Sequence, residues 1–154
     1  MTATAHALVG GVIASSTAQN PALGLTLAFV SHPLMDAIPH WDFGIGWKKK
    51  SRLKFFLEAS FDFSLGLTVS YFLFGQNLEL WYFWIVIFAS ESWDLVETPY
   101  WFLNWRFPPF STLYNFSKKL HSEIKPFWGI VTQVVTVVLV ILLFQYIHLT
   151  GYQF

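Results

Sequence analysis

Cysteine is absent from the 154 residues of the chain, and charged side chains make up only 12% of them. Without cysteine the chain forms no disulfide framework, no thiolate nucleophile and no cysteine-ligated zinc site. Any bound metal must therefore be held by histidine and carboxylate side chains. The formal net charge is zero, which argues against nucleic acid as a partner, because nucleic-acid-binding proteins normally carry a large basic excess.

Several motifs of known hydrolases are also missing. The sequence contains no HExxH of an intramembrane metalloprotease, no GxSxG of a serine hydrolase and no GxxxxGK[ST] phosphate-binding loop. The motifs of lipid phosphatases of the acid-phosphatase type are missing as well. Any hydrolytic chemistry must therefore rest on the histidines and carboxylates that the chain does contain.

Hydrophobic residues, in contrast, make up 55% of the chain and aromatic residues 20%. Because one membrane crossing needs about 20 mostly apolar residues, we predict an all-α fold, an integral membrane bundle of about five helices that forms one transmembrane domain. The expected helices cover residues 3–19, 21–38, 52–75, 78–98 and 117–148 of the domain 1–154. The first two are slightly short, so they either cross fully or form a re-entrant hairpin.

The basic residues indicate the orientation of this bundle. All nine lie in two connections, as Lys48, Lys49, Lys50, Arg52 and Lys54 in one and Arg106, Lys118, Lys119 and Lys125 in the other. Lysine and arginine near helix ends stay in the cytoplasm, and in a five-crossing bundle these two loops share a side. We therefore expect a cytoplasmic N-terminus, with the lipid bilayer as partner and basic loops that attract anionic lipid headgroups.

The remaining ionisable side chains gather near the cytoplasmic ends of the predicted helices. The members of this layer are His6, His32, Asp36, His40, Asp42, Glu58, Asp62, Glu91, Asp94 and His121. His32 and Asp36 are four residues apart, so both side chains lie on one helical face. The carboxylates at 58 and 62 are also four residues apart, and those at 91 and 94 are three apart, so each of these pairs likewise lies on one helical face. Three helices thus each present a pair of ligand-type side chains to the same layer.

Carboxylates at this depth cost several kcal/mol unless they are paired, protonated or bound to a cation. A metal ion compensates best, and mixed histidine and aspartate ligands suit zinc, manganese or iron. The surplus over four ligands leaves room for a second metal or for general acid and base groups. Other interpretations stay open: His40 and Asp42 could form a solvated turn after Pro39, Glu58 could pair with Lys54, and the pair at 91 and 94 could anchor loop lysines.

Three stretches, TAHALVGGVIA, FVSHPLMDAIPHWDFG and KLHSEIKPFWGIVTQ, resemble a family of small bacterial inner-membrane proteins described as metal-dependent hydrolases. That group includes the LexA-regulated membrane hydrolases and is loosely similar to zinc-dependent phospholipase C. The resemblance implies a helical fold in a bacterial inner membrane, with His6, His32, Asp36 and His121 as metal ligands. It also implies the hydrolysis of an ester or phosphoester.

We therefore expect a metal-dependent hydrolase that acts on an ester or phosphoester, with a lipid headgroup as one candidate, at the cytoplasmic leaflet. Asp62 and Asp94 complete the expected set of ligands to zinc, with manganese or iron as alternatives. The catalytic proton carriers are then expected among the remaining members of the layer, which are His40, Asp42, Glu58 and Glu91. Two other functions remain open: a metal or proton transporter that uses the same carboxylates, and a non-enzymatic scaffold with structural ion pairs.

Overall fold

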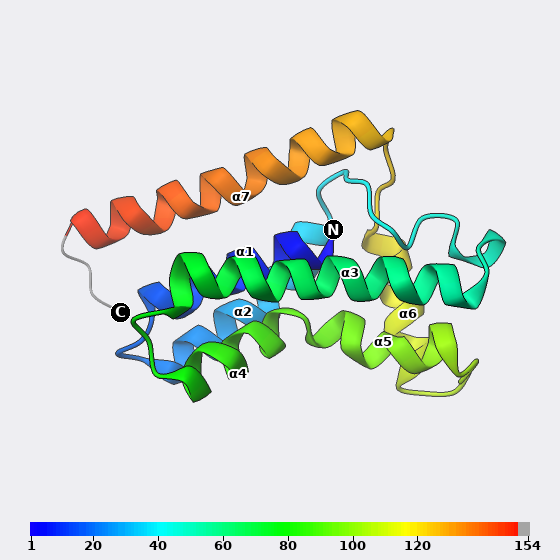
Figure 1. Cartoon of the computed structure of the whole chain (residues 1–154), viewed down its shortest axis with the longest axis horizontal. Helices are drawn as coiled ribbons and strands as arrows, with labels where there is room; N and C mark the ends of the chain where they lie inside the picture. Colours follow the sequence, from blue (N-terminus) through cyan, green and yellow to red (C-terminus); the bar gives the residue numbers. More distant parts are fainter. Residues whose placement is uncertain (151–154) are drawn as a thin grey trace.

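The computed structural model describes residues 1–150, and within this range the protein contains seven α-helices and no β-strand (Figure 1). The helices are α1 (Ala3–Ser16), α2 (Pro21–Asp36), α3 (Arg52–Ser70), α4 (Leu80–Ser90), α5 (Ser92–Phe102), α6 (Phe110–Leu120) and α7 (Pro126–Leu149). A 3₁₀-helix (Trp47–Lys49) precedes α3, and a π-helical stretch (Tyr71–Gly75) continues it. The predicted all-α class is confirmed.

Helix α1 lies at the centre of the bundle and packs against α2, α3, α4 and α7. Its glycines permit this close packing, because a Cβ atom added at Gly10 would lie 2.5 Å from the Ser90 hydroxyl and one at Gly11 2.2 Å from the Ser70 hydroxyl. The Ser90 hydroxyl also donates a hydrogen bond of 3.2 Å to the carbonyl of His6. Helix α4, which ends at Ser90, therefore holds His6 in position.

Helices α1 and α2 end a few residues earlier than expected, at Ser16 and Asp36, and two of the expected helices are divided. The expected helix over 78–98 is divided at Glu91 into α4 and α5, and α5 continues through Pro99 to Phe102. At the break, the Ser90 carbonyl accepts a 2.6 Å hydrogen bond from Nδ1 of His32. The expected helix over 117–148 is divided into α6 and α7, and α7 begins at Pro126, a residue type favoured in the first helical turn because it needs no N–H partner there. The count of about five helices is thereby corrected to seven within residues 1–150.

The segment after α2 is held between two other parts of the chain. The backbone N–H of His40 donates to the Ser122 carbonyl at 3.0 Å, and the N–H of Ile124 donates to the His40 carbonyl at 3.2 Å. From α7, Gln133 Nε2 donates to the Trp41 carbonyl at 2.7 Å. These bonds fix the backbone on both sides of His40 and bring it beside residues 121–125.

Gly129 in the first turn of α7 lies directly against this segment. A Cβ atom at position 129 would lie 2.4 Å from the Trp41 backbone nitrogen and 2.9 Å from the His40 carbonyl carbon. Backbone atoms cannot move aside as a flexible side chain can, so we expect Gly129→Ala to lower the free energy of unfolding by about 1–3 kcal/mol. Thermal unfolding in detergent measures this change.

The matched control for this variant is Val134→Ala, since Val134 lies on the same helix with its side chain exposed. This substitution should change the stability by less than about 0.5 kcal/mol. Equal unfolding temperatures for Gly129→Ala and the unmodified protein would contradict the close packing of α7 on the segment around His40.

Helix α7 is also the most apolar element. Residues Pro126–Ile147 span 22 residues with a mean hydropathy of 2.5, and by length and composition they can cross a membrane. The apolar helices α1 and α4 are shorter. In Figure 1, α7 runs along one side of the bundle beside α1, which agrees with the contacts between these two helices.

Candidate metal centre

Two groups of histidine and aspartate side chains each bring three ligand atoms within 4.8 Å of one another. The first group contains His6 from α1 with His32 and Asp36 from α2, and all three are buried. The second group contains His40 and Asp42 from the segment after α2 and His121 from the segment after α6. We call them the His6 group and the His121 group.

In the His6 group both imidazoles face the same carboxylate. Nε2 of His6 lies 3.1 Å from Oδ1 of Asp36, and Nε2 of His32 lies 3.4 Å from its Oδ2. The two rings are stacked with their centroids 3.8 Å apart. The Met1 amino group also contacts Oδ1 of Asp36. Because Nδ1 of His32 contacts a carbonyl, it must donate, which leaves Nε2 of the neutral ring as a free lone pair.

The His121 group has the same design. Nε2 of His40 lies 3.2 Å and Nε2 of His121 3.6 Å from Oδ2 of Asp42. Nδ1 of His40 contacts the carbonyl of Ile38 at 2.7 Å, so it donates and leaves Nε2 available. Oδ1 of Asp42 is used differently, because it accepts the backbone N–H of Gly44 at 2.6 Å. The carboxylate is thereby fixed with Oδ2 directed at the histidines.

Asp36 connects the two groups. Its Oδ1 atom lies 3.9 Å from Nε2 of His40, which belongs to the His121 group. On the far side of the His6 group, Oδ1 of Asp94 lies 3.6 Å from Nε2 of His32. The side chains therefore form one continuous row, in which Asp36 lies between the two sets of imidazoles and Asp94 is within reach as a further ligand of the first.

The electrostatics of the His121 group favour an ionised Asp42 and a neutral His121. Burial alone raises the pKa of Asp42, but the contact with Nε2 of His40 and the positive charge of the nearby N-terminus outweigh it and hold that pKa below its usual value. Burial lowers the pKa of His121. An ionised carboxylate and a neutral imidazole are the protonation states that metal ligation requires.

The donor set and its burial fit a divalent cation. Nitrogen and oxygen ligands of this kind suit zinc, manganese or iron. Nδ1 of His6 and both carboxylate oxygens of Glu91 are buried and have no hydrogen-bond partner within the described part of the chain. Unpaired buried polar atoms are unusual in folded proteins, so their presence beside this row of ligands indicates that the site is built for an additional polar group.

The other carboxylates of the predicted layer lie in three different environments. Asp62 accepts hydrogen bonds from the backbone N–H groups of Ala3 and Thr4 at 2.7 and 3.2 Å, so it binds the first turn of α1. Glu58 pairs with Lys50 at 2.5 Å. Glu91 lies buried at the junction of α4 and α5. The structure therefore brings neither Asp62 nor Glu58 into the two groups of ligands.

Two features of the centre carry little or no signal in the sequence. The Ser90 carbonyl orients His32 only because the helix breaks at this point, and nothing in the residue types predicts that break. Glu97 is buried with 2% of its surface exposed and accepts a hydrogen bond from Ser117 of α6. Its only signal is its spacing of three residues from Asp94 on an apolar helix.

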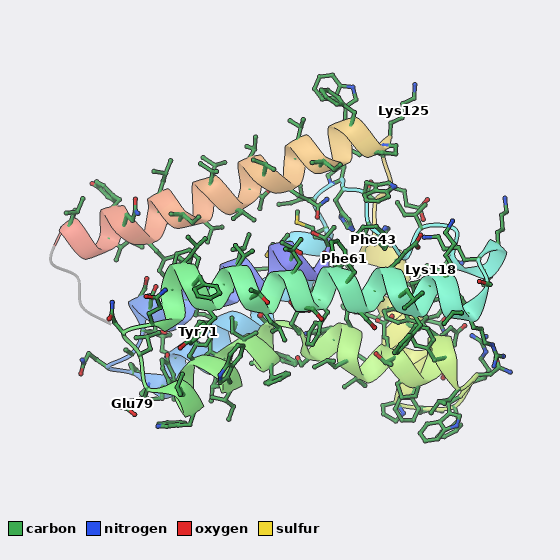
Figure 2. The ribbon with its side chains drawn as sticks, in the orientation of Figure 1. Phe43, Phe61, Tyr71, Glu79, Lys118 and Lys125 are labelled. Carbon is green, nitrogen blue, oxygen red and sulfur yellow. The ribbon has the colours of Figure 1, made fainter. Side chains whose placement is uncertain are left out.

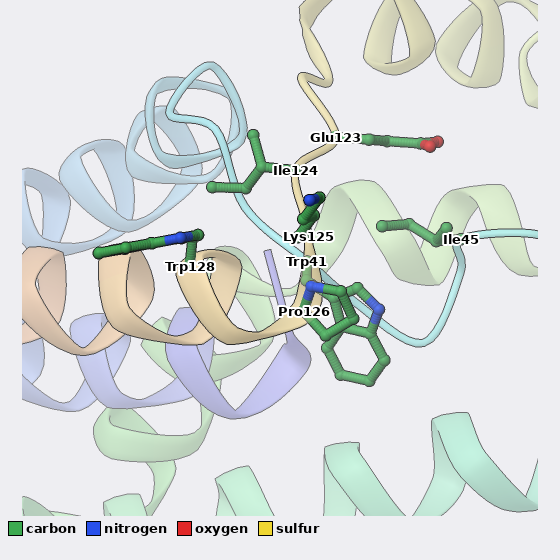
Figure 3. A pocket seen from close by; sticks show the side chains of 7 residues that line it. All are labelled: Trp41, Ile45, Glu123, Ile124, Lys125, Pro126 and Trp128. Carbon is green, nitrogen blue, oxygen red and sulfur yellow. The ribbon is translucent and has the colours of Figure 1, made fainter.

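A pocket of about 540 Å³ adjoins both groups and is bounded by α3, α5, α6 and the segment after α2. Seven carboxyl side chains line it, against a single lysine, Lys118. Such an excess of negative charge would repel an anionic substrate unless cations were bound. A second pocket is lined by seven residues, which include Trp41 and Trp128 (Figure 3). None of the ten candidate residues lines this pocket.

Comparison with protein-family models, with curated proteins and with solved structures finds no match for this chain. The class of protein is therefore defined by the fold and the site themselves. It is an all-α protein with two adjacent histidine and aspartate groups that could hold a metal ion.

Proposed function

We propose that the protein is a membrane-embedded, metal-dependent hydrolase of an ester or phosphoester. The observation that carries this proposal is the convergence of four imidazole Nε2 atoms on two aspartates, the buried Asp36 and the partly buried Asp42. In two of these histidines a backbone carbonyl accepts the Nδ1 proton. Such outer partners fix the tautomer and orientation of histidine ligands in metal sites.

The proposed location in a bilayer is supported by the outer surface of the helices. Large apolar side chains are exposed on α3, the π-helical stretch after it, α4 and α7, including Phe61, Phe72, Trp81, Ile85, Leu139 and Leu142. Contiguous apolar surface of this extent marks contact with a membrane or a partner protein. We propose that α7 crosses a bacterial inner membrane, that α1, α2, α3 and α4 lie beside it within the bilayer, and that α5 and α6 cover the site at the interface of the cytoplasmic leaflet.

The distribution of charge supports this orientation. In Figure 2, Lys118 and Lys125 lie in the half of the molecule that contains α6, whereas Glu79 lies at the opposite end. In Figure 1, the segment before α3 lies in the same half as α6, so the basic residues before α3 belong to this half too. Because lysine and arginine near helix ends stay in the cytoplasm, this distribution supports a cytoplasmic location for this half.

The proposed ligands are His6, His32 and Asp36 in one group and His40, Asp42 and His121 in the other. A divalent cation in such a site polarises an ester or phosphoryl oxygen and supplies hydroxide near neutral pH. The aspartates keep the imidazoles oriented, and burial of the His6 group excludes bulk water from it. Zinc fits this ligand set best, with manganese and iron as alternatives.

Two further residues have roles in this proposal. Glu91 is buried and unpaired beside the ligands, so it is placed to hold a proton for the leaving group, a role worth about 10²–10⁴-fold in rate. Lys118 lines the same pocket and can bind a phosphoryl oxygen. The excess of carboxylates in the pocket is then balanced by the bound cations and by this lysine.

Hydrolysis of bis(p-nitrophenyl) phosphate and of p-nitrophenyl acetate by the detergent-purified protein tests the proposal. We expect activity that a chelator removes and zinc or manganese restores. His32→Ala should lower it by more than the roughly 10- to 100-fold that loss of an outer partner costs. Glu79→Gln is the control, because Glu79 lies at the far end of the molecule, and it should change nothing.

Three results would contradict this function. A metal-loaded protein that hydrolyses neither compound but moves zinc or protons across liposomes would be a transporter. A folded protein that binds no divalent cation would be a scaffold with structural ion pairs. Activity that survives complete removal of metal would contradict the proposed chemistry.

A further inference from the structure

The pocket beside the metal centre is lined by two kinds of side chain. The polar residues, which we call the polar side, include Asp36, Asp42, His121, Glu91 and Asp94. The apolar residues include Phe55, Phe56, Trp101 and Phe102, whose rings contact one another in a cluster that we call the apolar side. A small water-soluble ester would occupy only the polar side. The apolar side therefore needs its own explanation.

The apolar side reaches the outer surface of the molecule between α3 and α5. Phe56 and Leu95 line the pocket, yet 53% and 41% of their surfaces are exposed. In Figure 1, α5 runs beside α3 at the end of the bundle away from the α3–α4 turn. At this edge, the side chains that line the pocket are thus also exposed on the outer surface of the bundle.

Aromatic rings form the contact between the two helices here. The Phe55 and Phe102 rings are stacked with centroids 5.0 Å apart, and the Phe56 and Phe102 rings meet edge to face at 5.9 Å. Trp101 meets the Phe55 ring at 5.9 Å. No hydrogen bond or ion pair between α3 and α5 occurs in the described residues, so only ring contacts have to adjust to admit a chain between these helices.

On the proposed function, we infer that the substrate is a lipid whose ester or phosphoester reaches the metal centre while its hydrocarbon chain lies along these rings. The chain enters from the bilayer between α3 and α5. Burial of each methylene group against the rings raises affinity by about fourfold. Leu53 and Leu57 of the same helix are also exposed, so apolar surface borders the proposed entrance.

A photoreactive probe tests this inference without relying on hydrolysis. Dodecylphosphonate with a diazirine at the chain end is crosslinked to the zinc-loaded protein in nanodiscs, and the modified residues are identified by mass spectrometry. We expect modification at residues 55–56 and 101–102, which excess unlabelled dodecylphosphonate abolishes and methylphosphonate reduces. Modification confined to the outer faces of α4 and α7 would overturn the inference.

Kinetics with a matched pair of substrates, methyl and dodecyl p-nitrophenyl phosphate, provide the second arm. Phe56→Ala should lower kcat/KM for the dodecyl ester roughly tenfold, through lost apolar contact, and leave that for the methyl ester unchanged. The control Phe61→Ala, an exposed ring on the same helix that does not line the pocket, should change neither value. An equal fall for both esters with Phe56→Ala would overturn the inference.

The two arms separate this inference from the function on which it rests. If neither ester is hydrolysed but the probe labels residues 55–56 and 101–102, the hydrolase fails and the lipid site stands. If the methyl ester is hydrolysed and the probe labels other surfaces, the hydrolase stands and the lipid site fails.

Discussion

Replacement of Asp36 by alanine is expected to cause the largest loss of metal affinity of any single substitution in this protein. Asp36 contacts His6 and His32 through its two oxygens and lies 3.9 Å from His40 of the neighbouring group. Its removal therefore affects both groups. We expect the affinity for zinc to fall by well over the roughly 100-fold that marks the upper range for an outer partner. Competition with a chromophoric chelator measures this fall.

The matched control for Asp36→Ala is Asp62→Asn. Asp62 binds the first turn of α1 through backbone N–H groups, so this change should lower stability while leaving the zinc affinity nearly unchanged. The folded state of each variant is monitored by size-exclusion chromatography. An Asp36→Ala protein that elutes as the unmodified one and keeps its zinc affinity would contradict the role of Asp36 between the two groups.

Substitution of one histidine in each group is expected to remove the two cations separately. His32→Ala removes a buried ligand of the His6 group, and His121→Ala removes a half-exposed ligand of the His121 group. Each variant should retain about one of two zinc ions, and the double variant about none, because structural zinc sites normally use four ligands and tolerate few losses. Elemental analysis after gel filtration gives the zinc content of each.

The stoichiometry also distinguishes two cations from one. If the six ligands hold a single shared ion, then both single variants lose it entirely and the double variant is no worse. A zinc content unaffected by His121→Ala would show that residues 40, 42 and 121 form only a hydrogen-bonded turn.

The sequence was sufficient to predict the parts of the site that depend on local helix geometry. The spacing of four residues between His32 and Asp36 places both on one face of α2. In the structure, Nε2 of His32 lies 3.4 Å from Oδ2 of Asp36. The predicted layer of polar groups also included His6 of α1, which contacts Asp36 in the structure. The all-α class followed from apolar segments too long for strands, and it is confirmed by the seven helices within residues 1–150.

The parts that depend on tertiary contacts could not be predicted in this way. His40 and His121 meet because the backbone of residues 121–125 pairs with that of His40, and no local pattern encodes this pairing. The bond between His32 and the Ser90 carbonyl likewise depends on the break between α4 and α5. Asp62 has ligand chemistry, yet the unpaired N–H groups at the start of α1 are equally good partners for a carboxylate.

The central claim is that imidazole nitrogens bind divalent metal in this protein, and X-ray absorption spectroscopy of the zinc-loaded protein tests it most directly. The account predicts nitrogen and oxygen ligands at about 2.0–2.1 Å, with the multiple-scattering pattern of two or more imidazoles per zinc, and loss of that pattern in a variant without His6, His32, His40 and His121. A zinc spectrum with oxygen ligands alone, or a folded protein that retains no zinc, would contradict it.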